Sequence, residues 1–236
     1  ESLYEHNYFN NLMVSFQELS ITLVTTVFFA MVISILTGYL SILSMRFGKF
    51  VSSINNAIES IPSIFIVLFC YAPVSGALAK NSGSTSTVLS LVVFVAAATS
   101  TVLPEAVRSI SIPLSDLYNR KYSVSFRSYG FAKSRILMVL MKTSLIKDAI
   151  KRVAAAILLK TLILDTSFGY VIQVGLGSTG TPSHTSPGAL IAAHRKTLLG
   201  MFSNDGSPAM FWIPTVILIA VSLAFLIILN ENKEAK

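Results

Sequence analysis

The chain has 236 residues, of which 53% are hydrophobic and only 12% are charged, and its formal net charge is +7. Soluble domains carry about 25% charged residues, and a soluble fold of this length cannot hide so much apolar surface in one core. Composition therefore excludes an ordinary soluble domain, and the positive charges, which lie beside apolar runs, indicate orientation in a membrane rather than nucleic-acid binding.

Charge-free apolar runs predict the membrane spans in chain order. A spanning helix needs about 20 predominantly apolar residues. Four runs lack Asp, Glu, Lys and Arg altogether: 19–45, 60–79, 81–104 and 206–229. A fifth and weaker run, 153–164, is interrupted by Lys160, but the alternation of loop charge requires it to span. We therefore expect an all-α membrane protein with one domain, 1–236, and five spans at about 19–45, 60–79, 85–105, 145–167 and 208–230.

Lys and Arg residues are distributed unequally between the two sides of these spans. Arg46 and Lys49 follow the first span, ten more lie within 108–152, and two lie in the tail, whereas Lys80, Arg195 and Lys196 lie on the other side. Cytoplasmic loops carry the positive excess. We expect the 105–150 segment and the C-terminus inside, and the N-terminus and an external loop at about 170–205 outside. An N-terminus on the outside fits either a membrane span that precedes it or export of a short N-terminal segment.

The 105–150 segment is too polar to span and predicts a cytoplasmic structure. Ser115 and Asp116 are turn formers, Gly130 suits a sharp turn, and apolar residues recur through 136–141. The pattern predicts a short helix at the cytoplasmic face, a turn near Gly130, and a helix that enters the bilayer. An ordinary solvated basic loop is the alternative.

Several motifs along the chain are similar to those of one transporter family. They are Gly38-Tyr39, Glu59-Ser60-Ile61-Pro62-Ser63, the stretch from Tyr122 to Gly130, Ser134-Arg135-Ile136-Leu137, Thr185 to Leu190, and the terminal helix after Trp212. With these motifs the chain resembles the permease subunits of dipeptide, oligopeptide and nickel ABC importers. The family's cytoplasmic signature has Glu-Ala-Ala, three residues and Gly; Gly130 matches, whereas Val124, Ser125 and Phe126 replace the first three, and Thr143 stands where the family often has Pro.

The resemblance implies a type I ABC importer permease fold with five core spans and a cytoplasmic coupling helix. It implies a multi-pass subunit in a bacterial inner or plasma membrane, with a second homologous permease, two ABC ATPase subunits and an extracytoplasmic solute-binding protein as partners. ATP and Mg would be bound by the ATPase subunits, since this chain has no G-x-x-x-x-G-K-[ST] sequence. The chain is expected to be a transport subunit surrounded by lipid, not an enzyme, and to bind no nucleic acid.

The resemblance also implies that a coupling segment at about 108–135, with its helix at 115–130, docks on an ATPase. Its expected contact residues are Tyr122, Phe126, Arg127, Tyr129 and Gly130. Phe126 and Tyr129 suit an apolar groove, and Arg127 suits acidic groups on a partner or lipid phosphates. Alternatively, the two aromatic rings rest in the lipid headgroup layer.

Lys160 and Glu59 are candidate pathway residues. An ionisable group within a span usually faces a cavity or a partner. Lys160 therefore either lines a pathway or pairs with Glu59 or Glu105, and snorkelling to the interface is the alternative. Asp165, five residues further along, is expected at the outer interface.

Other residues that resemble chemical sites are explained more simply. The stretch 175–180 fits G-x-G-x-x-G, but no strand and helix surround it, so a flexible external loop is expected. His6, His184 and His194 lack metal-ligand spacing, and Cys70 is the single cysteine, so neither a metal site nor a disulfide is expected. No catalytic constellation is apparent.

The sequence thus predicts a permease subunit that forms half of a pathway for a small solute, with peptides as the first expectation. A nickel or metal-chelate importer permease is the alternative within the family. An ion-coupled secondary transporter and a non-transporting membrane scaffold are the alternatives from other classes.

Overall fold

A computed structural model describes residues 2–80, 84–176, 186–195 and 208–234. These residues form helices joined by turns, with no strand among them, which confirms the all-α prediction. The helices are α1 (Ser2–Leu43), α2 (Met45–Glu59), α3 (Ser63–Lys80), α4 (Ser84–Asn119), α5 (Lys121–Ser128), α6 (Lys133–Leu140), α7 (Ser144–Leu176), α8 (Pro187–Ala193) and α10 (Ala209–Glu234).

Four of these helices are long and apolar enough to cross a membrane by themselves. They are α1 over Tyr8–Leu43, α4 over Val88–Asn119, α7 over Ser144–Ile172 and α10 over Ala209–Asn230. A fifth crossing is available if α2 and α3 form one broken span, since the two are bent by 90° at a short break. The protein is therefore a multi-pass membrane protein with four or five spans.

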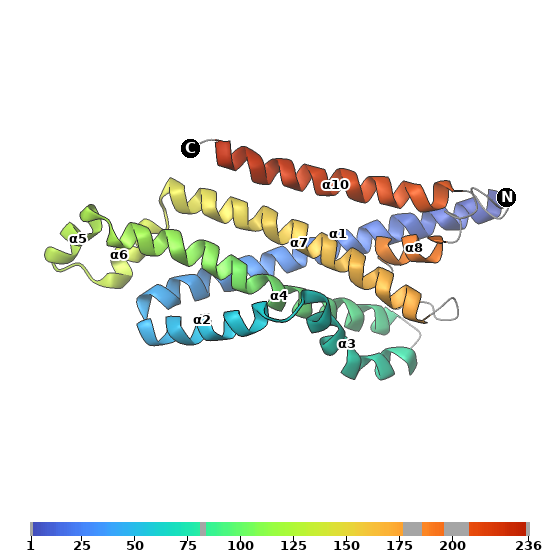
Figure 1. The fold of residues 1–236 in the computed structure, drawn as a ribbon, viewed down its shortest axis with the longest axis horizontal. Helices are drawn as coiled ribbons and strands as arrows, with labels where there is room; N and C mark the ends of the chain where they lie inside the picture. Colours follow the sequence, from blue (N-terminus) through green and yellow to red (C-terminus); the bar gives the residue numbers. More distant parts are fainter. Residues whose placement is uncertain (1, 81–83, 177–185, 196–207, 235–236) are drawn as a thin grey trace.

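The long helices lie lengthwise beside one another, and the short ones gather at the two ends (Figure 1). Helices α5 and α6 lie at one end, and the last turn of α10 points the same way. The start of α1 lies at the opposite end, near α8. The positive-inside rule predicts that the end that holds the Lys- and Arg-rich α5 and α6 faces the cytoplasm, so we name it the cytoplasmic end and the other the outer end.

Helix α4 corrects the expected boundary between the third span and the coupling segment. It runs without a break through Pro104 and Pro113 to Asn119, so Ser115 and Asp116 are helical and form no turn. Leu114 and Leu117 explain this, because their side chains are buried against α6 and α7 in a cluster that includes Leu137 and Ile146. Packing outweighs local turn propensity here, and prolines are tolerated in long membrane helices.

The residues between the first two expected spans form α2 instead of a loop. Helix α2 contacts α1 and α4 lengthwise and buries no residue fully. It ends where the amides of Ser60 and Ile61 donate to the carbonyls of Asn56 and Ile58. Pro62 follows and has no amide to continue the helix, so the chain bends into α3 at this point.

The expected external loop at 170–205 contains helical structure. Helix α7 continues to Leu176, and α8 is a buried helix that starts with a hydrogen bond from the Ala189 amide to the Ser186 hydroxyl, 3.2 Å long. Glycines hold α7 and α8 together: a Cβ atom on Gly188 would overlap the carbonyl of Thr166, and one on Gly169 would overlap the side chain of Ser186. The end of the G-x-G-x-x-G stretch and His184 lie outside the described residues.

Candidate functional site

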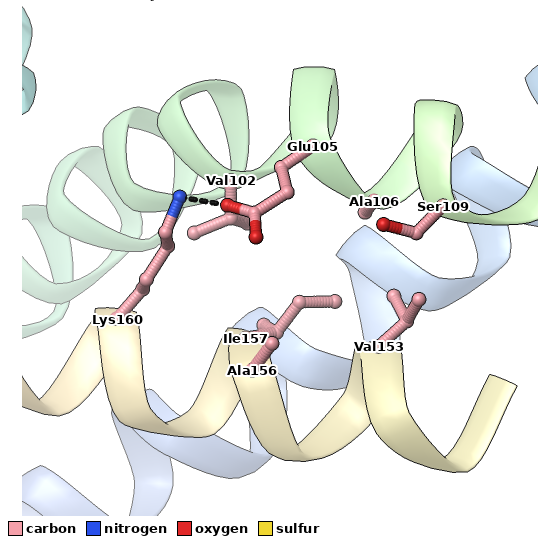
Figure 2. A pocket seen from close by; sticks show the side chains of 8 residues that line it. All are labelled: Val102, Glu105, Ala106, Ser109, Val153, Ala156, Ile157 and Lys160. Carbon is pink, nitrogen blue, oxygen red and sulfur yellow. Dashed lines mark hydrogen bonds and ion pairs between the residues drawn. The ribbon is translucent and has the colours of Figure 1, made fainter. Parts of the chain in front are cut away.

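A cleft between α4 and α7 holds an ion pair between Glu105 and Lys160 (Figure 2). Glu105 is one of the two partners that the sequence suggested for Lys160, and this pairing is confirmed. The cleft is open on one side and small, with a volume of about 20 Å³, which is room for about one water molecule. Its other lining residues are mostly small or apolar: Val102, Ala106, Ser109, Val153, Ala156 and Ile157.

The core residues beside this ion pair show where it lies along α1. Val102 and Ile157, which line the cleft, pack in one core cluster with Ala30 of α1. Ala30 lies well inside the charge-free stretch 19–45 of α1, with eleven residues before it and fifteen after it. The ion pair therefore lies level with the apolar middle of α1, whereas on α4 it follows directly after the charge-free stretch 81–104.

The two charged side chains are only half covered by this chain. The side chain of Lys160 is 51% exposed and that of Glu105 is 50% exposed. A charged group at the bilayer centre costs about 2.5–3.5 kcal/mol on insertion scales when it faces lipid. Such residues nearly always face water or protein. This side of α4 and α7 therefore faces a water-filled space or another protein rather than hydrocarbon.

A second ion pair lies beside the first, on the same helix α4. Arg108 donates to Glu59 of α2 over 2.8 Å and to the side-chain oxygen of Asn56 over 3.3 Å. Glu59, which the sequence offered as a partner of Lys160, is thus paired with Arg108 instead. Arg108 lies three residues after Glu105, so both side chains belong to one face of α4.

These residues form a charged stripe across α2, α4 and α7, which consists of Asn56, Glu59, Glu105, Arg108 and Lys160. It contains two cations and two anions, so its formal charge is zero. Sequence reasoning did not single out Arg108 and Asn56, because it did not predict a helix between the first two spans. The signal available in the sequence was the spacing of Glu105 and Arg108, two charged residues three positions apart on one helix.

Asp165 is not part of the charged stripe. Its side chain is fully buried within the bundle, so the expectation that it sits at the outer interface is wrong. Helix α7 continues for eleven residues beyond Asp165 to Leu176, which places Asp165 inside the span instead of at its end.

The coupling segment at the cytoplasmic end turns at Gly130, as the sequence predicts. Gly130 has φ +80°, the left-handed conformation that favours glycine. The Phe131 amide donates to the Phe126 carbonyl over 3.2 Å, and the Gly130 amide donates to the Arg127 carbonyl over 3.0 Å. With the rings of Phe126 and Phe131 in contact, this is a complete Schellman motif that ends α5.

Side chains attach this turn firmly to the membrane helices. The buried Ser123 hydroxyl donates to the Leu117 carbonyl of α4 over 2.8 Å. The guanidinium of Arg127 lies over the ring of Tyr118, 4.6 Å from its centre, so Arg127 is held by its own chain. On α6, the Lys133 ammonium donates to the Leu43 carbonyl at the end of α1 over 3.3 Å.

The outward side of the coupling segment is aromatic and exposed. Tyr129 is 80% exposed, and Tyr122 and Phe126 are about half exposed. Phe131, Tyr118 and Lys133 belong to the same structure, although sequence reasoning did not single them out. Their contacts depend on the reversal at Gly130, which spacing alone does not reveal.

The outer end carries an aromatic contact between α1 and the end of α8. The ring of His194, at the end of α8, meets the ring of Tyr8 at 5.4 Å, and burial lowers the pKa of His194 below its usual value. Within the described part of the chain, no three His, Cys, Asp or Glu residues gather as metal ligands.

Neither a family model, nor a curated protein, nor a solved structure matches this chain. The features that bear on function are therefore the charged stripe, the coupling segment and the sequence motifs.

Proposed function

We propose that the chain is a permease subunit of an ATP-driven bacterial importer and forms half of a pathway for a small solute. The observation that carries this proposal is the charged stripe on α2, α4 and α7, whose charged side chains are about a third to a half exposed beside the apolar middle of α1. Because lipid is a poor neighbour for these charges, a second permease subunit is expected to face the stripe across a hydrated space.

The coupling segment supports the ATP-driven part of the proposal. Its exposed face offers Tyr122, Phe126 and Tyr129 to a partner, and aromatic side chains commonly anchor protein interfaces. Its inner face is fixed to α4 through Ser123 and to α1 through Lys133. A push on this segment by an ATPase subunit would therefore move two membrane helices together.

The proposed assembly contains two permeases, two ABC ATPases that bind ATP and Mg, and an extracytoplasmic solute-binding protein, in a bacterial cell membrane. The chain itself has a transport role rather than an enzymatic one. Peptides remain the preferred solute, because the stripe has no net charge and its donors and acceptors suit a polar, dipolar molecule. A nickel pathway would be expected to present a surplus of anionic or imidazole ligands.

The first test is gentle-detergent purification of the tagged chain, with co-purifying proteins identified by mass spectrometry. Recovery of a second permease and of P-loop ATPases is expected. The recovered complex is then placed in proteoliposomes, and uptake of radiolabelled trialanine is measured with ATP and with a non-hydrolysable analogue.

Uptake that requires ATP hydrolysis is the expected result. A chain that purifies alone and moves a solute down an ion gradient without ATP would contradict the proposal and favour a secondary transporter. A chain that purifies alone and moves none of the tested solutes would favour a scaffold.

A further inference from the structure

Building on the function proposed above, we infer that Glu105 and Lys160 form a charge filter that binds the ammonium and carboxylate groups of a zwitterionic solute. The two side chains meet across the cleft between α4 and α7, and each is half exposed on the side that faces away from the core (Figure 2). A solute in the proposed pathway would therefore reach both charges.

The filter works because each charge is more stable beside a charged partner than beside the apolar walls of the cleft alone. Separating this half-exposed ion pair without a replacement is therefore unfavourable. A solute can enter between the two side chains only if its ammonium group replaces Lys160 beside Glu105 and its carboxylate replaces Glu105 beside Lys160. A solute with one charge leaves one side chain unpaired, and an uncharged solute leaves the pair closed.

The second ion pair of the stripe is built to stay closed. Arg108 holds both Glu59 and Asn56, and Glu59 is the less exposed partner, at 35%. Lys160, in contrast, holds Glu105 with a single ammonium on a flexible side chain. The small residues Ala106, Ser109 and Ala156 line the cleft beside this pair, and the cleft is open on one side.

The filter is tested by direct binding to the chain, with its co-purified membrane partners, in lipid nanodiscs without any solute-binding protein. Four probes of nearly equal size are titrated by NMR: trialanine, N-acetyl-trialanine, trialanine amide and N-acetyl-trialanine amide. These are a zwitterion, an anion, a cation and a neutral molecule. We expect trialanine to bind up to roughly fivefold more tightly than each of the others, since each missing charge leaves a half-exposed side chain unpaired.

Two single variants should then change this preference in opposite ways. In Lys160→Met, trialanine and trialanine amide should bind equally, because the carboxylate has lost its partner, while the preference over N-acetyl-trialanine remains. In Glu105→Gln, trialanine and N-acetyl-trialanine should bind equally, while the preference over trialanine amide remains. The control Lys147→Met, an exposed lysine nearer the cytoplasmic end of α7, should leave all four affinities unchanged.

The exchanged double variant E105K/K160E keeps an ion pair in the cleft and should retain the preference for trialanine. Loss of this preference in the double variant would overturn the filter. Equal binding of all four probes by the unaltered chain, or unchanged preferences in both single variants, would overturn the filter. Neither result would affect the proposed function, which is tested separately by the measurement of ATP-dependent uptake.

Discussion

The rings of Phe126 and Phe131 meet edge to face, with their centres 5.8 Å apart, on either side of the reversal at Gly130. The two backbone hydrogen bonds of the Schellman motif and this ring contact fix the direction in which the chain leaves α5. The orientation of the exposed aromatic face therefore depends on one backbone angle.

Gly130→Val should uncouple ATP hydrolysis from transport while the chain still inserts into the membrane. Nothing lies within 4 Å of a Cβ atom at this position, so the cost comes from the φ of +80° alone, about 1–2 kcal/mol for a residue with a side chain. The measurement is the number of solute molecules imported per ATP hydrolysed in proteoliposomes. Gly130→Asn is the control, because Asn tolerates this conformation. Normal coupling in the valine variant would count against the coupling role.

Tyr129→Ala should weaken the association with the ATPase subunits. Tyr129 is 80% exposed, and truncation of an interface anchor commonly costs more than about 1 kcal/mol, or roughly fivefold to tenfold in affinity. The yield of co-purified ATPase per permease measures the effect. Phe28→Ala, which removes an exposed ring from the middle of α1, serves as the control. Equal ATPase yields from the two variants would argue for the headgroup-layer alternative.

Gly188→Ala should destabilise the outer end of the bundle. The added methyl group would overlap the backbone of Thr166 in α7, which cannot move as a side chain can. Overpacking typically costs about 1–3 kcal/mol, so the detergent-solubilised chain should unfold several degrees lower. In Gly38→Ala the new methyl meets Cγ2 of Ile110 at 3.3 Å, and this side chain can adjust. Gly38→Ala should therefore lower the unfolding temperature less than Gly188→Ala does. An equal or larger decrease in Gly38→Ala would contradict the prediction.

Arg108→Met should reduce transport, and the exchange R108E/E59R should restore much of it. The pair joins the end of α2, next to the bend at Pro62, to the middle of α4. Because both groups are partly exposed, we expect a modest coupling energy of about 1 kcal/mol in a double-mutant cycle of thermal stability. Absence of rescue by the exchange would show that Arg108 acts through something other than Glu59.

Sequence reasoning found those features that depend on short stretches of chain. The charge-free runs predicted the long helices, and Gly130 was recognised as a turn because glycine adopts a positive φ more readily than other residues. For Lys160, the sequence suggested Glu59 or Glu105 as the pairing partner, since intramembrane charges must be paired and few acidic residues were available.

Features that depend on contacts between distant helices were missed. Ser115 and Asp116 look like turn residues, and only the burial of Leu114 and Leu117 against α6 and α7 explains why the helix continues. Asp165 was placed at the interface because hydropathy alone cannot show that α7 continues to Leu176. The choice between Glu59 and Glu105 depended on α2 being a helix beside α4, where Arg108 takes Glu59.

The bond from Lys133 to the last carbonyl of α1 has a mechanical consequence. Helix α1 is 42 residues long without a break, and its Ala30 is enclosed by α4 and α7. If Ala30 acts as the fulcrum, the inner arm to Leu43 has 13 residues and the outer arm to Tyr8 has 22. At 1.5 Å per residue these arms are about 20 Å and 33 Å long, so a sideways step of about 2 Å at the inner tip becomes about 3 Å at the outer tip, in the opposite direction. Such a lever would open one mouth of a channel as it closes the other.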